Sequence, residues 1–250
     1  MIKMRDTPPV TIELHLTYHC NLACLYCNRA GFAKTGWQPP DMTIEDADRF
    51  LDDFRSVADK IGMVIVIGGE PTLNANCLAI MERLQPIRQL SPNLKLQICS
   101  NGYTVETRRI LAEIEYRKLA NVPHEMWKLY GSVTDHIWKT IFVSPADCGI
   151  NVSVPCDWHS WGGCGISADS LGYTICPDGG MIDSVLGLGV RSHQLVDMFD
   201  RSIAQSQTDA LCRHCGAYLD KVLEPCLAGM QRYGLTPMSP TWYNKLVKHE

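Results

Sequence analysis

Residues 11–27 read T-I-E-L-H-L-T-Y-H-C-N-L-A-C-L-Y-C, and this stretch decides the fold. Its first seven residues alternate, so that Ile12, Leu14 and Leu16 share one face and the polar residues between them share the other. Such alternation predicts a β-strand with one buried face. Three cysteines follow at once, with gaps of three and two residues between them. A metal site directly after the first strand is therefore expected.

The alternation of strand and helix patterns continues outward from this stretch. Strands are predicted over 11–17, 63–67 and 94–99, and helices over 43–61, 76–84 and 105–119. Thr43 begins the first helix with a capping box, because Asp46 lies three residues further on. Strands that alternate with helices imply an α/β fold with a parallel sheet and short loops at the carboxyl ends of the strands.

Length and composition set the broad class. The chain has 250 residues, of which 46% are hydrophobic and 20% charged, with a formal net charge of -4. The run 63–67 is the longest apolar stretch, far below the ~18 residues of a membrane helix, and residues 1–10 lack the apolar core of a secretory signal. The charge lacks the cationic footprint of a nucleic-acid binder. A soluble, cytoplasmic protein with no membrane and no nucleic-acid partner is expected.

The 12 cysteines are too many to be explained by packing alone, and in a reducing compartment such residues are more often metal ligands. Three thiolates on one loop, Cys20, Cys24 and Cys27, can hold three corners of a cubane iron–sulfur cluster and leave one iron open. The alternative is a structural zinc site, which needs a fourth ligand close by.

This run resembles the cluster-binding motif of the radical S-adenosylmethionine (radical SAM) superfamily, and Tyr26 occupies the aromatic position before its last cysteine. Two further strand ends resemble the same family. One carries the motif that contacts the amino group of S-adenosylmethionine, and the other the segment that contacts its ribose. The residues concerned are Gly68, Gly69 and Glu70 after the second strand, and Ser100, Asn101 and Gly102 after the third.

The resemblance implies a partial (βα) barrel, a SAM-binding 4Fe-4S cluster and S-adenosyl-L-methionine as cofactors. It also implies an electron donor such as flavodoxin or ferredoxin. Reductive cleavage of the cofactor would give a 5'-deoxyadenosyl radical that removes a hydrogen atom from the substrate. The residues themselves add that glycines at 68 and 69 allow close approach, since they have no Cβ.

A second group of cysteines lies in the last hundred residues. Cys164 and Cys176 flank a stretch that predicts a hairpin, and Cys212 and Cys215 form a two-residue knuckle. Four thiolates could bind a second iron–sulfur cluster or zinc. The arrangement resembles twitch, a shortened form of the SPASM auxiliary-cluster module found in superfamily members such as 2-deoxy-scyllo-inosamine dehydrogenase. A second, auxiliary 4Fe-4S cluster is the expectation.

A domain boundary is placed near residue 150. Residues 1–150 are predicted to form the radical SAM partial-barrel domain, and 151–250 a small cysteine-rich α+β domain of the twitch type with a helix near 195–204. Cys156 and Cys226 are left as packed thiols, replacement ligands or hydrogen-atom donors. Packed thiols are expected for the scattered cysteines, which are Cys77, Cys99 and Cys148.

A fully ligated second cluster has no vacancy for substrate, so its natural task is electron transfer. The leading hypothesis is therefore an oxidoreductase that dehydrogenates a small polar metabolite. Such a reaction needs a base, for which the candidates are His15, Asp157 and His159, with Glu13 and His193 as further possibilities.

Three alternatives remain open. The same radical could begin an epimerisation, with a cysteine as hydrogen donor, or it could modify a peptide. The second is less favoured because about ten residues precede the first strand, which leaves no room for a peptide-recognition domain. The third alternative, of another class, is a zinc-stabilised binding module without catalysis.

Overall fold

The computed structural model describes residues 10–22, 27, 29, 39–91, 93–122, 142–152, 165–216, 231–233 and 236–248. The strands of the main sheet are β1 (Val10–His15), β2 (Ile61–Ile67), β3 (Lys95–Ile98), β4 (Ile166–Asp169) and β5 (Gly172–Thr174). A separate two-stranded sheet contains β6 (Gln231–Tyr233) and β7 (Thr236–Met238). The α-helices are α1 (Ile44–Arg55), α2 (Cys77–Arg83), α3 (Ile87–Leu90), α4 (Val105–Tyr116), α6 (Gly179–Leu186), α7 (Arg201–Leu211) and α9 (Pro240–Tyr243).

The main sheet has the strand order β3-β2-β1-β4-β5. Neighbouring strands from β3 to β4 run parallel, and only β5 runs antiparallel to its neighbour β4. The fold is thus a mixed α/β fold with a sheet dominated by parallel pairing, as predicted. The predicted hairpin between Cys164 and Cys176 is formed by β4 and β5, and it extends this sheet from the free edge of β1.

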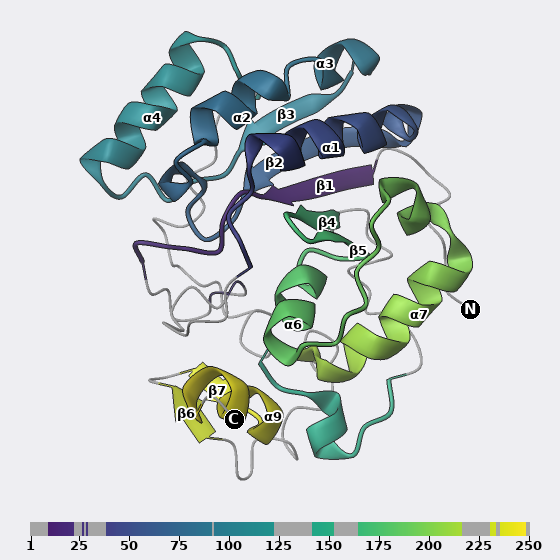
Figure 1. Cartoon of the computed structure of the whole chain (residues 1–250). Helices are drawn as coiled ribbons and strands as arrows, with labels where there is room; N and C mark the ends of the chain where they lie inside the picture. Colours follow the sequence, from purple (N-terminus) through teal and green to yellow (C-terminus); the bar gives the residue numbers. More distant parts are fainter. Residues whose placement is uncertain are drawn as a thin grey trace.

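The alternation in β1 has the predicted effect. Ile12 and Leu14 are fully buried and pack in one core with Phe50 and Phe54 of α1. Helices α1 to α4 lie together on one side of the sheet, and α6 and α7 lie on the other (Figure 1). The polar face of β1 is therefore the face on the side of α6.

Helix α1 begins as predicted and ends earlier. The Asp46 amide donates to Thr43 Oγ1 (3.1 Å), and the Thr43 amide donates back to Asp46 Oδ2 (2.9 Å), which completes the capping box. The helical spacing of apolar residues continues to Ile61, but α1 ends at Arg55. Ile61 instead starts β2 and pairs with Val10, because strand pairing outweighs the local helical pattern at this point.

The helix predicted near 195–204 is divided in two. Leu195–Phe199 forms a 3-10 helix, and α7 starts after Asp200, whose Oδ1 accepts from the amides of Ser202 (2.7 Å) and Ile203 (3.2 Å). A carboxylate that binds the first free amides of a helix fixes its start.

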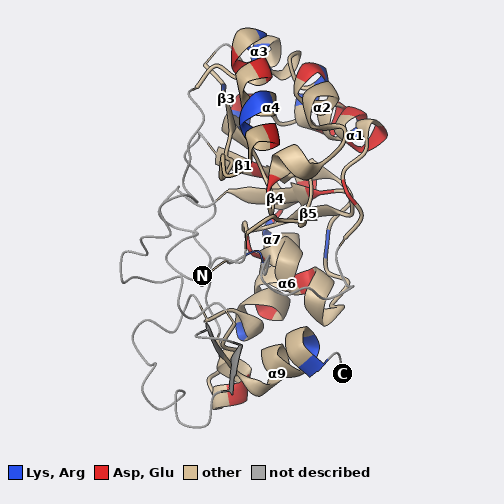
Figure 2. Cartoon of the chain, turned by 90° about the vertical axis from the view of Figure 1, so that its left-hand side faces the viewer, with Lys and Arg blue, Asp and Glu red and all other residues tan. Residues whose placement is uncertain are grey.

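The C-terminal segment packs against residues 142–148. The Ser239 amide donates to the Phe142 carbonyl (3.0 Å), and the two aromatic rings of Phe142 and Trp242 meet edge to face at 5.3 Å. Acidic and basic residues are interspersed along α1 to α4 (Figure 2). Among the helices of the described residues, none has the length and apolar character to cross a membrane.

Candidate functional site

The ends of β1, β2 and β3 meet at one edge of the sheet. Because the three strands are parallel, the loops that follow them lie side by side there. The backbone joins two of these loops directly, since the Gly69 amide donates to the Thr17 carbonyl (2.7 Å) and the Glu70 amide to the His19 carbonyl (2.8 Å). The predicted motif at 68–70 therefore rests against the residues that lead into Cys20.

Glu70 ties the second loop to the third. Its side chain is fully buried, and Oε1 accepts from Ser100 Oγ (2.8 Å) and from the hydroxyl (2.8 Å) and amide (3.2 Å) of Thr72. Its other oxygen, Oε2, accepts from the Asn101 amide (2.7 Å). The carboxylate predicted to contact a ligand is thus occupied by four hydrogen bonds from the protein.

Asn101 ties the third loop to the first cysteine. Its Nδ2 donates to Asn21 Oδ1 (2.7 Å) and lies 3.9 Å from Cys20 Sγ, while its Oδ1 accepts from the Tyr103 amide (2.8 Å). A hydrogen-bond donor at a thiolate is one of the means by which proteins set the reduction potential of an iron–sulfur cluster. Five of the predicted ligand contacts and one predicted metal ligand are therefore brought together in the structure.

Gly68 and Gly69 are required for a different reason from the predicted one, which was close approach of the backbone to a ligand. A Cβ at Gly68 would overlap the Thr17 carbonyl oxygen, and a Cβ at Gly69 would overlap the carbonyl oxygens of His19 and Tyr18. The close approach that the glycines permit is thus made by the backbone that carries Cys20. This contact fixes where the first cysteine lies relative to β2.

The first cysteine group is partly described. Cys20 and Cys27 are half-buried, while Cys24 and Tyr26 lie outside the described residues. In the described part of the chain, no three Cys, His, Asp or Glu residues form a group that could hold a metal ion.

Arg29, two residues after Cys27, is buried on the α6 side of the sheet. Its Nη1 donates to Asp178 Oδ1 (2.8 Å), and its Nη2 forms an ion pair with Glu13 Oε2. Burial opposes the charge of Arg29, but the two carboxylates outweigh it and raise the pKa of the guanidinium. Arg29 therefore stays charged in the interior.

Of the three leading candidates for the base, the structure describes His15, while Asp157 and His159 lie outside the described residues. Its ring is buried and stacks on Tyr18 with centroids 5.3 Å apart, and its Nε2 lies 3.8 Å from Glu13 Oε2. Of the two further candidates, Glu13 is paired with Arg29, and His193 is exposed.

A second buried ion-pair group lies next to Tyr18. Arg191 pairs with Asp169 (2.7 Å) and with Asp183. The Tyr18 hydroxyl donates to Asp169 Oδ2 (3.1 Å), and burial, with the Asp169 charge, raises the pKa of Tyr18 well above its usual value. Tyr18 is therefore a neutral hydrogen-bond donor rather than an acid–base group.

The second cysteine group is also partly described. Cys176 lies between β5 and α6, and Cys212 and Cys215 lie in and after the 3-10 helix Cys212–His214 that follows α7. The start of α6 packs on the end of α7, because a Cβ at Gly179 would lie 3.1 Å from Leu211 Cδ1. The segments that carry these three thiols are thus held by adjoining helix ends. Cys164 lies outside the described residues.

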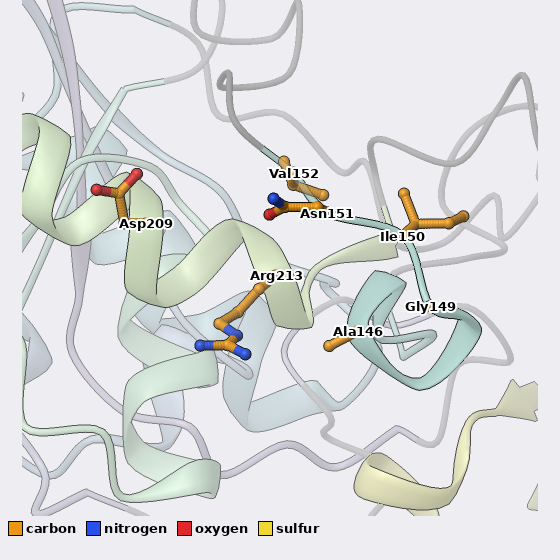
Figure 3. Close-up of a pocket in the computed structure, with 7 residues that line it drawn as sticks. All are labelled: Ala146, Gly149, Ile150, Asn151, Val152, Asp209 and Arg213. Carbon is orange, nitrogen blue, oxygen red and sulfur yellow. The ribbon is translucent and has the colours of Figure 1, made fainter.

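The knuckle between Cys212 and Cys215 is covered by the C-terminal segment. Trp242 Nε1 donates to the His214 carbonyl (2.8 Å), and Ser144 Oγ lies 3.2 Å from His214 Nδ1. Burial lowers the pKa of His214. A pocket of about 550 Å³ opens beside the knuckle (Figure 3). Its lining is Ala146, Gly149, Ile150, Asn151, Val152, Asp209 and Arg213.

The scattered cysteines divide into two kinds. Cys77 and Cys99 are buried, as predicted, and burial with the nearby Glu70 charge raises the pKa of the Cys77 thiol to about 12. The prediction for Cys148 is wrong, because it is half-buried and disulfide-bonded. A disulfide-bonded cysteine carries no thiol, so Cys148 is not a packed thiol.

Sequence reasoning missed Arg29, Asp178 and Asn21. Arg29 lies two residues after Cys27, and Asp178 lies two residues after Cys176, but this spacing does not predict that they meet. Only the three-dimensional arrangement shows that these two charges pair.

Comparison with known proteins agrees with this geometry. Residues 14–125 match the family model of the Radical SAM superfamily. Over 100 residues the chain is 33% identical to a probable GTP 3',8-cyclase of Pyrococcus horikoshii, a match that covers 39% of this chain and 28% of that protein. Residues 14–125 are therefore a radical SAM domain, a family that implies a 4Fe-4S cluster and S-adenosylmethionine.

The fold resembles that of BtrN. A crystal structure of BtrN in complex with AdoMet and 2-DOIA has a TM-score of 0.52 and 17% identity, and covers 84% of this chain and 94% of that one. A second BtrN structure, in an open conformation, has a TM-score of 0.51 and 14% identity, with 95% and 98% covered. The match to the cyclase spans less than a third of that protein's length, and the BtrN likeness concerns the fold alone.

Proposed function

We propose that this protein is a radical SAM oxidoreductase that dehydrogenates a small polar metabolite. The observation that supports radical SAM chemistry is the junction at the strand ends, where Asn101 links Cys20 and Asn21 to the loop held by Glu70. Three motifs, of which Cys20 and Asn101 are 81 positions apart in the chain, meet at one location, and a simple strand-to-helix turn does not require this.

The residues at this edge fit the cofactors that the family implies. Cys20, Cys24 and Cys27 would hold the cluster, and the backbone at Gly68 and Gly69 with Ser100 and Asn101 would receive S-adenosylmethionine. Because the Glu70 carboxylate is saturated, we assign it to holding the two loops in place rather than to the ligand's ammonium group. When bound, the cluster and cofactor would supply a 5'-deoxyadenosyl radical that removes a hydrogen atom from the substrate.

Dehydrogenation is supported by the second cysteine group. Cys176, Cys212 and Cys215, with Cys164, would hold an auxiliary cluster that takes up the electron left on the substrate, so that a C–H and an O–H or N–H are replaced by one double bond. His15 would accept the remaining proton. It lies on the side of the sheet that α6 covers, beside the Glu13 and Arg29 pair.

A small substrate is supported by the pocket beside the knuckle. Asp209 and Arg213 place charges of both signs there, together with the Asn151 amide and the apolar Ile150 and Val152 (Figure 3). Charged and amide groups beside apolar side chains are suited to a small polar molecule.

The test is the metal content and cofactor cleavage of anaerobically reconstituted protein. About eight irons per chain in the parent, about four in the Cys20, Cys24, Cys27 triple alanine variant, and dithionite-dependent release of 5'-deoxyadenosine from S-adenosylmethionine in the parent alone are expected. Four irons with zinc would retain the radical chemistry and refute the electron-accepting role of the second site. Zinc alone, with no cleavage, would contradict the whole proposal in favour of a binding module.

A further inference from the structure

Arg29 joins the two cysteine groups through one buried contact. It lies two residues after Cys27, and its partner Asp178 lies two residues after Cys176. Arg29 is 4% exposed and Asp178 5%, so this ion pair is shielded from water. The two residues are 149 positions apart in the chain. Their contact links two segments that the function proposed above assigns to different clusters.

The side chain of Asp178 contacts Arg29 and does not cap its own helix. Asp178 is the N-cap residue of α6, a position where an aspartate ordinarily accepts from the first free amides, yet it makes no such capping bond. Its Oδ1 accepts from Arg29 Nη1 at 2.8 Å. Its backbone is helical (φ -89°, ψ -15°), and its Oδ1 points to the residue that follows the first cysteine group rather than to the amides of α6.

Glu13 holds the same guanidinium from β1. The group thus contains one cation and two carboxylates, and Arg29 is fixed by the strand as well as by the start of α6. Two carboxylates at separate nitrogens leave the planar guanidinium little freedom to rotate. Arg29 therefore has a defined position relative to both β1 and the start of α6.

We propose that Arg29 is a positioning residue that locks the loop of Cys27 to the segment of Cys176, and so sets the separation of the two metal centres. The contact between Arg29 and Asp178 is independent of the proposed function. Its role in setting the separation of two metal centres rests on that function. Electron transfer between centres depends steeply on their separation, so an enzyme that passes an electron to a second cluster needs both loops in one fixed arrangement.

The variant that tests the lock is Asp178→Ala. It removes the partner on the side of Cys176 and leaves Arg29 paired with Glu13 as a neutral couple, whereas loss of Arg29 would leave two buried carboxylates facing each other. Asp178→Asn is the conservative variant, because its amide oxygen can still accept from Arg29. The matched control is Asp200→Ala, which removes an aspartate at the start of α7 that bonds only within its own helix turn in the contacts described above.

Amide hydrogen exchange of the anaerobically reconstituted protein gives the readout. In Asp178→Ala we expect the peptides that contain Cys27 and Cys176 to exchange together, about tenfold faster than in the parent, since a hydrogen bond to a charged group is lost. Asp178→Asn should show a smaller rise in both peptides, and Asp200→Ala a rise at α7 alone. Unchanged exchange, or a change confined to the Cys176 peptide, would overturn the lock.

A spectroscopic measurement separates positioning from general stability. With both clusters reduced by dithionite, their magnetic interaction speeds electron spin relaxation, and we expect this enhancement to be reduced in Asp178→Ala and restored in Asp178→Asn. An enhancement equal to that of the parent in both variants would contradict the lock. A parent with only four irons would refute the two-cluster function instead, while the exchange result would still decide whether the loops are coupled.

Discussion

Glu70 is buried without exposure, and its carboxylate accepts hydrogen bonds from Thr72, Ser100 and Asn101. We expect Glu70→Ala to lower the free energy of unfolding by about 3 kcal/mol, because bonds to a charged acceptor are lost and their buried donors stay unsatisfied. Urea denaturation measures this change. Glu82→Ala, which removes an exposed partner of Arg117, is the control and should cost less than about 1 kcal/mol. Equal costs would refute the role given to Glu70.

Cys77 gives a prediction about reactivity. Its pKa of about 12 leaves about 10⁻⁴ of the thiol ionised at pH 8, and the side chain is 1% exposed. We expect iodoacetamide to leave Cys77 unmodified in the folded protein and to label it once the protein is unfolded in urea. Mass spectrometry of the labelled peptides measures both states. Labelling of Cys77 in the folded protein at the rate seen in urea would contradict the packed assignment.

At the scale of single residues, the sequence predicted which strand ends carry the site residues but not which contacts hold these residues in place. Spacing alone places Cys20, Gly69 and Asn101 at strand ends, and the structure confirms that these ends meet. The pairing of Arg29 with Asp178 could not be predicted, because a contact across 149 positions depends on how α6 docks on the sheet. A charged residue in a sequence is usually exposed, so burial of this pair has no local signal.

At the scale of elements, the glycine pair after β2 gives a sharp test. A methyl group at Gly69 would meet the backbone carbonyls of Tyr18 and His19, which cannot rotate away as a side chain can. We expect Gly69→Ala to destabilise the protein by about 3 kcal/mol or more and to displace the loop of Cys20. Urea denaturation and the iron content after reconstitution measure the two effects.

Gly187→Ala is the control for this substitution. Gly187 ends α6 with a φ of +65°, and a Cβ there meets nothing within 4 Å. The cost should be confined to backbone strain of about 1 kcal/mol, with the iron content unchanged. If the two variants lost iron equally, the contact between β2 and the cysteine loop would not be what positions Cys20.

Elements with a clear period were predictable, and their ends were not. Alternation identified β1, and a capping box identified the start of α1, because both signals are local. The end of α1 depends on the pairing of Ile61 with Val10, which lies 51 positions earlier in the chain. The hairpin of β4 and β5 was predicted from its glycine-containing turn, but its attachment to the edge of β1 was not, since parallel pairing leaves no trace in a short strand.

At the scale of the whole molecule, the radical SAM domain was predictable from three motifs, while the arrangement of the last hundred residues was not. Its cysteines have wide spacing, and the segments between them lack a period that would fix a topology. The structure adds contacts that no motif carries. Residues 142–148, the knuckle after α7 and the C-terminal segment pack together through His214 and Trp242.

Trp242 is the residue on which this last contact depends. It is fully buried, its ring packs edge to face on Phe142, and its indole N–H satisfies the His214 carbonyl between the two cysteines of the knuckle. We expect Trp242→Ala to lower the free energy of unfolding by about 3–5 kcal/mol, as large aromatic truncations do. Trp242→Phe should cost about 1–3 kcal/mol, since the ring is largely kept and one carbonyl loses its donor.

The consequence for metal binding distinguishes this contact from ordinary core packing. If the C-terminal segment holds the knuckle in place, Trp242→Ala should lose the iron assigned to Cys212 and Cys215 while the cluster at Cys20 and Cys27 still cleaves S-adenosylmethionine. Iron content and release of 5'-deoxyadenosine, measured on the same reconstituted sample, separate the two sites. Loss of the iron at the knuckle together with loss of S-adenosylmethionine cleavage would mean that Trp242 supports the whole fold. Full retention of iron would mean that the knuckle does not depend on the C-terminal segment.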